Sequence, residues 1–407
     1  MCILIILIAK VVHISLNARG GAERLAVVTI KTLCSMGIDV ELATTEKPDM
    51  ALIRDAYGLG LDIKKISKLD LFNKNEKVTC DLTINTHGDM LPFFRKNFSK
   101  KNSIVYCHYP IARCLKDLRD PMYSDILQDM SKCSLEYTDK FSAEARNPYC
   151  KMMQNSTVLT NSEFSRRAIL KEFGVDSTVL PPPVDVDTFR NAALSSDARD
   201  ESILVVSRFH QSKKLENAIR LAEMLKQDGI GRYVKIAGNM SPVDVAYFSY
   251  LNNLVMQHGL KDFVKLEVNI NFNRLLDLMK QAKVYFHPMP GEPFGISTVE
   301  AMSAGLIPVV PAIGGHTEFV PKKYQFHTFG QAVEAVATAL DAPASERIQI
   351  SHSTQKYSTA NYVKKFQQVV TEVLDISTSL QHTPIILVSK KDSRQTTDPL
   401  NNRFFNG

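Results

Sequence analysis

Several patterns that would mark a particular class of protein are missing from this chain of 407 residues. The apolar run Cys2–Ala9 ends at Lys10, well short of the roughly 20 residues that a transmembrane helix needs. It has no basic segment before it and no clear cleavage site after it, so we expect no secretory signal peptide. We interpret the run either as an extension leading into the first strand or as a segment that touches a membrane.

Cysteine gives no sign of a disulfide framework or a zinc site, and tryptophan is absent altogether. The cysteine count is odd, no Cys-x-x-Cys spacing occurs, and none lies beyond residue 150. This distribution favours a reducing, cytoplasmic compartment. The seven cysteines are Cys2, Cys34, Cys80, Cys107, Cys114, Cys133 and Cys150.

The composition that remains is that of an ordinary globular protein, with 44% hydrophobic and 23% charged residues. The length favours two or three domains. A net charge of +6 is compatible with phosphate-bearing substrates or an anionic membrane surface, and it is diagnostic of neither.

Strand-like and helical runs alternate twice along the chain, which predicts an α/β fold with two doubly wound parallel sheets. The triple proline Pro181–Pro183 separates the two series, because proline stiffens the backbone and donates no hydrogen bond. We predict domains at residues 1–182 and 188–360, a late helix at 361–378 and a polar, flexible tail at 385–407. The predicted strands are Val11–Leu16, Asp39–Ala43, Thr83–Asn85, Ser103–Val105, Val158–Thr160, Ser202–Ser207, Tyr233–Ala237, Val264–Leu266, Val284–Phe286 and Leu306–Val310.

Two carboxylates, Glu292 and Glu300, lie between two of these strands, with seven residues between them. We predict Glu292 on the loop that follows the strand and Glu300 in the first turn of the next helix. A helix start attracts phosphate, and carboxylates accept hydrogen bonds from sugar hydroxyls. The pair therefore indicates a nucleotide-sugar site. The alternative is that Ser297 and Glu300 form a capping box, which would make Glu300 purely structural.

Basic and glycine-rich turns follow two other predicted strands. Arg208 and Lys213 lie at a strand end where doubly wound sheets bind ligands. They are interpreted as a clamp for a diphosphate, or else as a solvated basic turn. Gly20 and Gly21 open a helix and allow a ligand to approach backbone amides, or else they simply form a tight turn.

His108 lies in Tyr106–Pro110, directly after another predicted strand, and is either a site residue or a structural histidine. The segment Leu91–Asn102 interleaves three phenylalanines with four cations and has no acidic residue. We interpret it as a patch for an anionic membrane surface or as an ordinary surface helix. Nucleic acid would use the same residue types, but nothing else in the chain supports that partner.

The segment Gly291–Gly305 resembles the Glu-x(7)-Glu signature of the retaining glycosyltransferases of family 4, and the resemblance extends from about residue 10 to about residue 378. It implies the GT-B fold, in which two Rossmann-like domains face a cleft and a C-terminal helix crosses back to the first domain. The His-Tyr-Pro sequence at His108 is similar to that of mannosyltransferases that extend lipid-linked oligosaccharides.

The resemblance implies transfer of a hexose with retention at the anomeric carbon and without a bound metal. The acidic pair Asp185 and Asp187 therefore is not expected to be a metal site. Arg208 and Lys213 would stabilise the departing diphosphate, Glu300 would bind ribose, and His108 with the glycine loop would complete the site. The transferred sugar would be held by Glu292 and by backbone amides at Phe294, Gly295 and Ile296.

The expected donor is a GDP- or UDP-hexose, with mannose favoured, and the expected acceptor is a glycan or lipid-linked glycan. We expect a cytoplasmic protein, with peripheral attachment to a membrane as a further hypothesis. One alternative is a nucleotide-sugar-binding protein without transferase activity. The other is a Rossmann oxidoreductase, for which Glu41 could serve the ribose, but the glycine spacing is wrong for that fingerprint.

Overall fold

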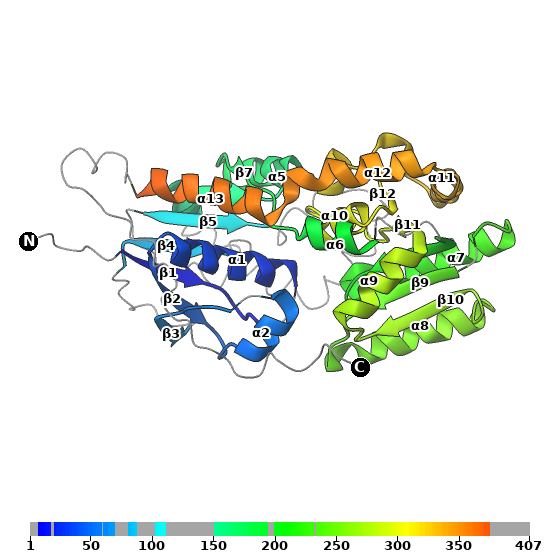
Figure 1. Ribbon diagram of the computed structural model, residues 1–407, viewed down its shortest axis with the longest axis horizontal. Helices are drawn as coiled ribbons and strands as arrows, with labels where there is room; N and C mark the ends of the chain where they lie inside the picture. Colours follow the sequence, from blue (N-terminus) through cyan, green and yellow to red (C-terminus); the bar gives the residue numbers. More distant parts are fainter. Residues whose placement is uncertain are drawn as a thin grey trace, which may run out of the picture.

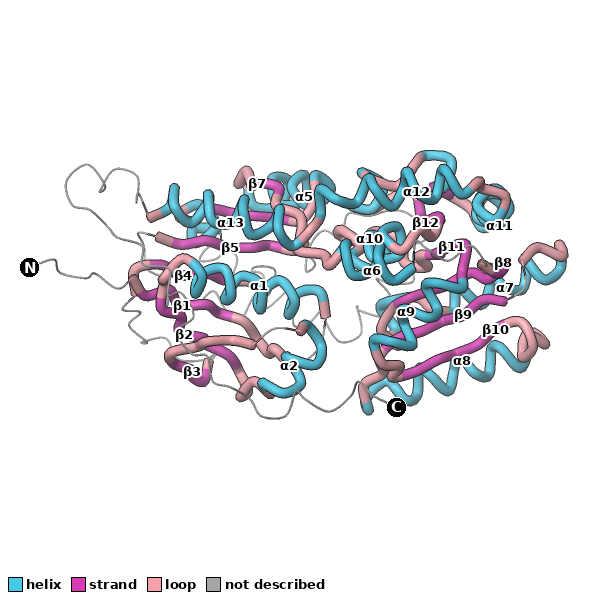
Figure 2. The backbone as a smooth tube through the Cα atoms, in the orientation of Figure 1, coloured by secondary structure: helices cyan, strands magenta, loops and turns pink. Residues whose placement is uncertain are grey.

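The computed structural model describes residues 7–17, 20–58, 60–69, 80–87, 102–110, 150–193, 199–231 and 233–374. Within these ranges, two α/β domains lie side by side, and each is built on a parallel sheet (Figures 1 and 2). The predicted fold class of two Rossmann-like domains is confirmed.

The first sheet contains seven strands among the described residues, and its order changes direction between β1 and β4. In spatial order the strands are β3 (Lys65–Lys68), β2 (Asp39–Thr44), β1 (Ile8–Val12), β4 (Leu82–Asn85), β5 (Ser103–Cys107), β6 (Thr157–Thr160) and β7 (Thr178–Val179). The central strands β1, β4, β5 and β6 are short runs that are almost wholly buried, as parallel sheets covered by helices require, whereas the edge strand β3 is largely exposed. The helices of this part are α1 (Gly21–Ser35), α2 (Met50–Tyr57) and α5 (Glu163–Phe173).

The second sheet contains six strands in the described part of the chain, and its order reverses between β8 and β11. Such reversal points are where open α/β sheets bind ligands. In spatial order the strands are β10 (Val264–Val268), β9 (Tyr233–Gly238), β8 (Asp200–Val206), β11 (Ala282–Phe286), β12 (Ile307–Pro311) and β13 (Gln325–Phe326). The helices are α6 (Val186–Ala193), α7 (Glu216–Gln227), α8 (Val245–Gln257), α9 (Phe272–Gln281), α10 (Ile296–Ser303), α11 (Phe329–Leu340) and α12 (Ala344–Ser353).

Three features differ from the predicted elements. Strand β1 ends at Val12, four residues before the predicted end, and it takes in Ile8 and Ala9 from the apolar run at the start. Strand β3 and helix α2 were not predicted. Helix α6 begins at Val186, inside the predicted connector, and Phe189 packs into the core of the second domain.

Helix α13 (Thr359–Val373) returns from the second domain to the first (Figure 1). It buries Tyr362, Phe366 and Val370 in the core that surrounds β1 and α1. The Tyr362 hydroxyl is 2.7 Å from the Thr29 hydroxyl of α1. The predicted crossing of the C-terminal helix is therefore confirmed, although the helix begins two residues earlier than residue 361.

The chain passes between the domains twice, and the two passages are hydrogen-bonded to each other. The Val184 N–H donates to the Tyr357 carbonyl at 3.0 Å, and the Thr359 N–H donates to the Val184 carbonyl at 3.0 Å. The predicted domain limits at residues 182, 188 and 360 lie beside these passages. The predicted tail at 385–407 lies outside the described residues, as do residues 1–6 of the apolar run.

Among the described residues, every helix is either too short or too polar to traverse a lipid bilayer. The cysteines in this part of the chain form no disulfide; Cys107 is buried in strand β5, and the others are partly exposed: Cys34, Cys80 and Cys150. The proposed membrane patch lies outside the described residues except for its last member, Asn102.

Candidate functional site

The backbone around Glu292 is fixed by the loop that follows the neighbouring strand β12. The Gly291 N–H donates to the Ile313 carbonyl at 2.9 Å, and the Gly315 N–H donates to the Glu292 carbonyl at 2.8 Å. A Cβ atom at Gly315 would lie 2.0 Å from the Pro293 carbonyl oxygen. Because only glycine allows this approach, the two loops hold Glu292 in one place.

The Glu292 side chain makes an ion pair with Lys213. Its Oε2 lies 3.0 Å from Lys213 Nζ and 3.5 Å from His287 Nε2, and both partners are largely buried. Burial raises the pKa of the Glu292 carboxyl, but Lys213 and His287 outweigh that effect and hold the pKa well below its usual range. Glu292 is therefore an ionised hydrogen-bond acceptor at neutral pH.

His287 and Tyr285 form a buried support behind this pair. The Tyr285 hydroxyl lies 3.2 Å from His287 Nδ1 and 2.8 Å from the Ser297 hydroxyl of α10. Both side chains come from the end of β11 and from the residue after it. The sequence showed a histidine after a strand here, but nothing in it marked His287 as a partner of Glu292.

Helix α10 begins at Ile296, with Gly295 at φ 97° as its N-cap and no side chain capping it. The alternative of a capping box between Ser297 and Glu300 is therefore wrong, because Ser297 lies inside the helix and bonds to Tyr285 instead. The predicted place of Glu300 in the first turn is also wrong, since it lies in the second. The uncapped start leaves the N-terminal amides to bind an anion.

Glu300 lies where the two domains meet. Burial raises the pKa of its carboxyl, Arg24 lowers it and Asp185 raises it, and the net result is a pKa of about 7. Arg24 belongs to α1 of the first domain, whereas Glu300 belongs to α10 of the second. At neutral pH this carboxyl is present in both protonation states.

The two predicted cations occupy the carboxyl end of β8, the strand next to β11. Lys213 ends a short 3-10 helix, Gln211–Lys213, and contacts Glu292. Arg208 is exposed, two residues after the strand ends. The structure thus joins Lys213 to Glu292 directly and places Arg208 at the same edge of the sheet.

The glycine loop of the first domain touches helix α10. A Cβ atom at Gly21 would lie 2.4 Å from Ile296 Cδ1, so the loop and the helix start are in close contact. Beside it, Tyr57 donates a hydrogen bond to the Gly20 carbonyl at 3.2 Å. Gly20 and Gly21 are therefore next to the predicted sugar-binding amides, as the sequence led us to expect.

His108 is half-buried at the end of β5. Its Nε2 lies 3.0 Å from the Thr86 carbonyl; since a carbonyl can only accept, Nε2 carries the hydrogen in this contact. Nδ1 is then the acceptor nitrogen of the neutral ring. Its ring centroid is 6.2 Å from that of His87, a residue that the sequence did not single out.

Further contacts join the domains beside the Glu292 loop. The Ser162 hydroxyl donates to the Pro293 carbonyl at 2.6 Å. The Glu318 carboxylate accepts from the Glu163 and Phe164 N–H groups at 3.1 and 2.7 Å, and so caps helix α5 of the first domain. These residues follow strands of both sheets, so the carboxyl ends of the two sheets face one another.

Residues 187–359 match the family model described as glycosyl transferases group 1. The GDP-Man:Man(3)GlcNAc(2)-PP-Dol alpha-1,2-mannosyltransferase of Dictyostelium discoideum is 23% identical over 300 residues, which are 67% of this chain and 59% of that protein. The human enzyme of the same name is 27% identical over 223 residues, 49% of this chain and 44% of that protein. The chain thus spans about half the length of these relatives.

A crystal structure of a glycosyltransferase from Rickettsia africae superimposes with a TM-score of 0.61 at 13% identity, covering 91% of this chain and 99% of that one. At this identity the likeness bears on the fold alone, and it confirms the predicted GT-B arrangement. The similarity to glycosyltransferases is confirmed at this level. Membership of family 4, retention and the individual site roles stay predictions.

Proposed function

We propose that this protein is a glycosyltransferase that moves a hexose from a nucleoside diphosphate sugar to a glycan or lipid-linked glycan, with retention at the anomeric carbon. The favoured donor is GDP-mannose, because two relatives named above are mannosyltransferases whose names begin with GDP-Man. The single observation that carries the proposal is the ion pair between Lys213 and Glu292 beside the uncapped start of α10.

This arrangement offers each part of a nucleotide sugar a complementary group. The ionised Glu292 accepts hydroxyls of the transferred sugar, each charge-assisted bond contributing about 1.5–3 kcal/mol. Backbone amides at Phe294, Gly295 and Ile296 complete the sugar pocket. Lys213 and Arg208 neutralise the charge that develops on the diphosphate as it departs. A bound diphosphate competes with Glu292 for Lys213, which frees the carboxylate for the sugar.

The first domain supplies the acceptor side. His108 offers Nδ1 as an acceptor nitrogen, and the Gly20–Gly21 loop meets helix α10 at Ile296. The leaving phosphate assists the acceptor hydroxyl on the same face of the sugar, so no side chain acts as a covalent nucleophile. The proposed acceptor is a lipid-linked oligosaccharide, in keeping with the names of the relatives, and the protein would meet it at the cytoplasmic face of a membrane.

Ligand-induced stabilisation tests the donor class first. Thermal melting with GDP, UDP and ADP should show the largest shift with the nucleotide of the true donor, because a ligand that binds only the folded state stabilises it by linkage. We expect GDP to give that shift. A larger shift with UDP would change the donor, whereas no shift with any of the three would remove the nucleotide-sugar proposal.

Turnover of GDP-mannose tests the reaction itself. Lys213→Met and Glu292→Gln should each lower turnover by about 100-fold or more, since Lys213 acts on the charge that develops on the departing diphosphate and Glu292 orients the transferred sugar. Lys280→Met is the matched control, because Lys280 pairs with Asp277 at 3.7 Å on the exposed face of α9. Binding without turnover in the wild type, with suitable acceptors present, would favour the binding-only alternative.

Two finer points of the proposal have their own measurements. The one-bond carbon–hydrogen coupling at the product's anomeric centre should report the α configuration of the donor, and an inverted product would refute retention. Transfer should continue in buffers without Mg²⁺ or Mn²⁺, because side-chain cations and the start of α10 neutralise the charge of the diphosphate. Loss of transfer without these ions, restored when they are added, would contradict this.

A further inference from the structure

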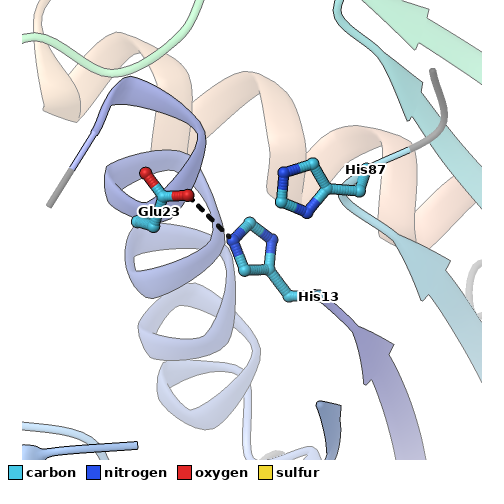
Figure 3. A group of neighbouring side chains, drawn as sticks. All are labelled: His13, Glu23 and His87. Carbon is cyan, nitrogen blue, oxygen red and sulfur yellow. Dashed lines mark ion pairs between the residues drawn. The ribbon is translucent and has the colours of Figure 1, made fainter. Parts of the chain in front are cut away.

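Two histidines and a glutamate gather at the carboxyl edge of the first sheet, and the proposed function uses none of them. His13 follows β1, His87 follows the adjacent strand β4, and Glu23 lies in the first turn of α1. One ligand-type atom from each lies within 4.8 Å of the others. Figure 3 shows the three side chains next to one another, and the two imidazole rings are stacked with centroids 4.0 Å apart. His13 and Glu23 are buried, and His87 is half-buried.

The contact with Thr86 shows which nitrogen of His13 faces the cluster. His13 Nδ1 lies 2.8 Å from the Thr86 hydroxyl, which in turn lies 3.0 Å from the Val12 carbonyl oxygen. Nε2 is therefore the nitrogen on the side of the cluster, and it lies 3.7 Å from Glu23 Oε1. Either a hydrogen on Nε2 or a metal ion can link these two atoms.

The remaining groups suit a metal ion. Glu23 Oε2 accepts the Gly20 N–H at 2.7 Å, which orients the carboxylate. His87 Nδ1 accepts the Ile14 N–H at 3.3 Å, and ligation at this nitrogen would replace that contact.

We propose that His13, Glu23 and His87 bind one divalent transition-metal ion of the zinc class. Two imidazoles and one carboxylate form a donor set used by zinc sites that keep a fourth position open. Calcium and magnesium prefer ligand sets made of oxygen alone. The Thr86 hydroxyl and the Gly20 amide are the outer contacts that orient the ligands, as such sites require. In a tetrahedral site with metal–ligand bonds of about 2.1 Å the ligand atoms lie about 3.4 Å apart, so atoms that now lie within 4.8 Å of one another must move closer by up to about 1.4 Å on binding.

A bound ion would also act on the rest of the molecule through Glu23. This carboxylate holds Gly20, and the next residue, Gly21, contacts Ile296 of the second domain. Fixing Glu23 therefore fixes the loop at which the domains meet. The inference needs no assumption about sugar transfer, and its test measures metal binding alone.

The untagged full-length protein, treated with a chelator and dialysed, is titrated with Co²⁺ as a spectroscopic probe and then with Zn²⁺. We expect the protein to bind one equivalent of Co²⁺, with the visible absorption bands that are typical of Co²⁺ with few ligands. One equivalent of Zn²⁺ should displace the Co²⁺ and abolish these bands. Zn²⁺ should also raise the melting temperature. His87→Asn should weaken binding by tenfold or more. Thr86→Val, which keeps all three ligands, should weaken it by about tenfold through loss of orientation.

His258→Asn is the matched control, because His258 makes an exposed pair with Glu223 at 2.8 Å on the other domain and should leave metal binding unchanged. Wild-type protein that binds no stoichiometric Co²⁺ or Zn²⁺ would overturn the proposal and leave the contact between His13 and Glu23 as a purely structural one. Equal binding by wild type and His87→Asn would overturn it as well. His87 is half-buried, so this variant keeps the test decisive even if substitutions of the buried Glu23 prevent folding.

Discussion

Glu300 should make binding of the nucleotide sugar depend on pH near neutrality. Burial, reinforced by Asp185 and opposed by Arg24, raises the pKa of its carboxyl to about 7. The family resemblance implies that this group accepts hydrogen bonds from the ribose hydroxyls of the donor, which a carboxylate does better than a protonated acid. Binding should therefore strengthen as the pH rises through 7.

The size of the effect follows from the ionised fraction. With a pKa of about 7, roughly one tenth of Glu300 is ionised near pH 6 and roughly nine tenths near pH 8. If only the carboxylate form grips the ribose, affinity rises about ninefold over this interval, which equals about 1.3 kcal/mol. That gain lies just below the usual range of about 1.5–3 kcal/mol for hydrogen bonds to charged groups.

Calorimetric titration of GDP-mannose near pH 6, 7 and 8 measures this dependence. GDP-mannose is preferable to GDP, because its diphosphate has no terminal group that titrates in this interval. Glu300→Gln is the matched variant, since it keeps the shape and removes the titrating group. Near pH 8 the variant should bind GDP-mannose more weakly than the wild type does, and its affinity should hardly change with pH. Any pH dependence that remains in the variant comes from other titrating groups of the site.

Arg24 provides a second check on the same reasoning. It is the cation that lowers the pKa of Glu300, so Arg24→Met should move the midpoint of the wild-type curve to higher pH. A flat wild-type curve, or an equal slope in wild type and Glu300→Gln, would refute the role given to Glu300. A midpoint unchanged in Arg24→Met would show that the domains do not meet at these two residues in solution.

Three other predictions concern the loops around the site. Lys213→Met should lower the free energy of unfolding in urea by about 2 kcal/mol, because it leaves the Glu292 carboxylate without its cation. Adding Glu292→Gln should restore most of this free energy. No recovery in the double variant would contradict the pairing. Gly315→Ala should cost more than about 1 kcal/mol, since its Cβ would lie 2.0 Å from a backbone oxygen, whereas Gly330→Ala in helix α11 should be neutral or stabilising. Glu318→Ala should cost about 1 kcal/mol through loss of the cap on α5, and an unchanged denaturation midpoint would show that this contact contributes nothing.

Much of the fold follows from local sequence, and the misses have a physical cause. Buried strands such as β4 and β6 were predicted to within one residue, because their apolar runs are short and bounded by turns. Strand β3, Lys65–Lys68, was missed because it is an exposed edge strand whose sequence alternates weakly. Helix α6 was missed because it follows a triple proline and its packing depends on Phe189, which only the tertiary structure brings into the core.

The site was predictable as a set of residues but not as a geometry. Lys213 and Glu292 are 79 residues apart, and they meet because β8 and β11 are neighbours in the sheet. Strand order is not readable from one sequence, so this pairing came from resemblance to a family. His13 and His87 are brought together in the same way, by β1 and β4. No resemblance pointed to them, and they were not predicted.

Contacts with the first domain help to hold the Glu292 loop, which belongs to the second domain, in place. The Ser162 hydroxyl donates a hydrogen bond to the Pro293 carbonyl, and Gly21 is in contact with Ile296. The charge of Arg24 lowers the pKa of Glu300. Residues of the first domain therefore interact with three positions of this loop and of helix α10. The two backbone passages at residues 184 and 358 are hydrogen-bonded to each other and form the covalent connection about which the domains can rotate. Any such rotation must break the Ser162 bond and separate Arg24 from Glu300. Separation from Arg24 removes a charge that lowers the pKa of Glu300, whereas exposure of the carboxyl to water removes the burial that raises it, and burial is the larger of the two causes.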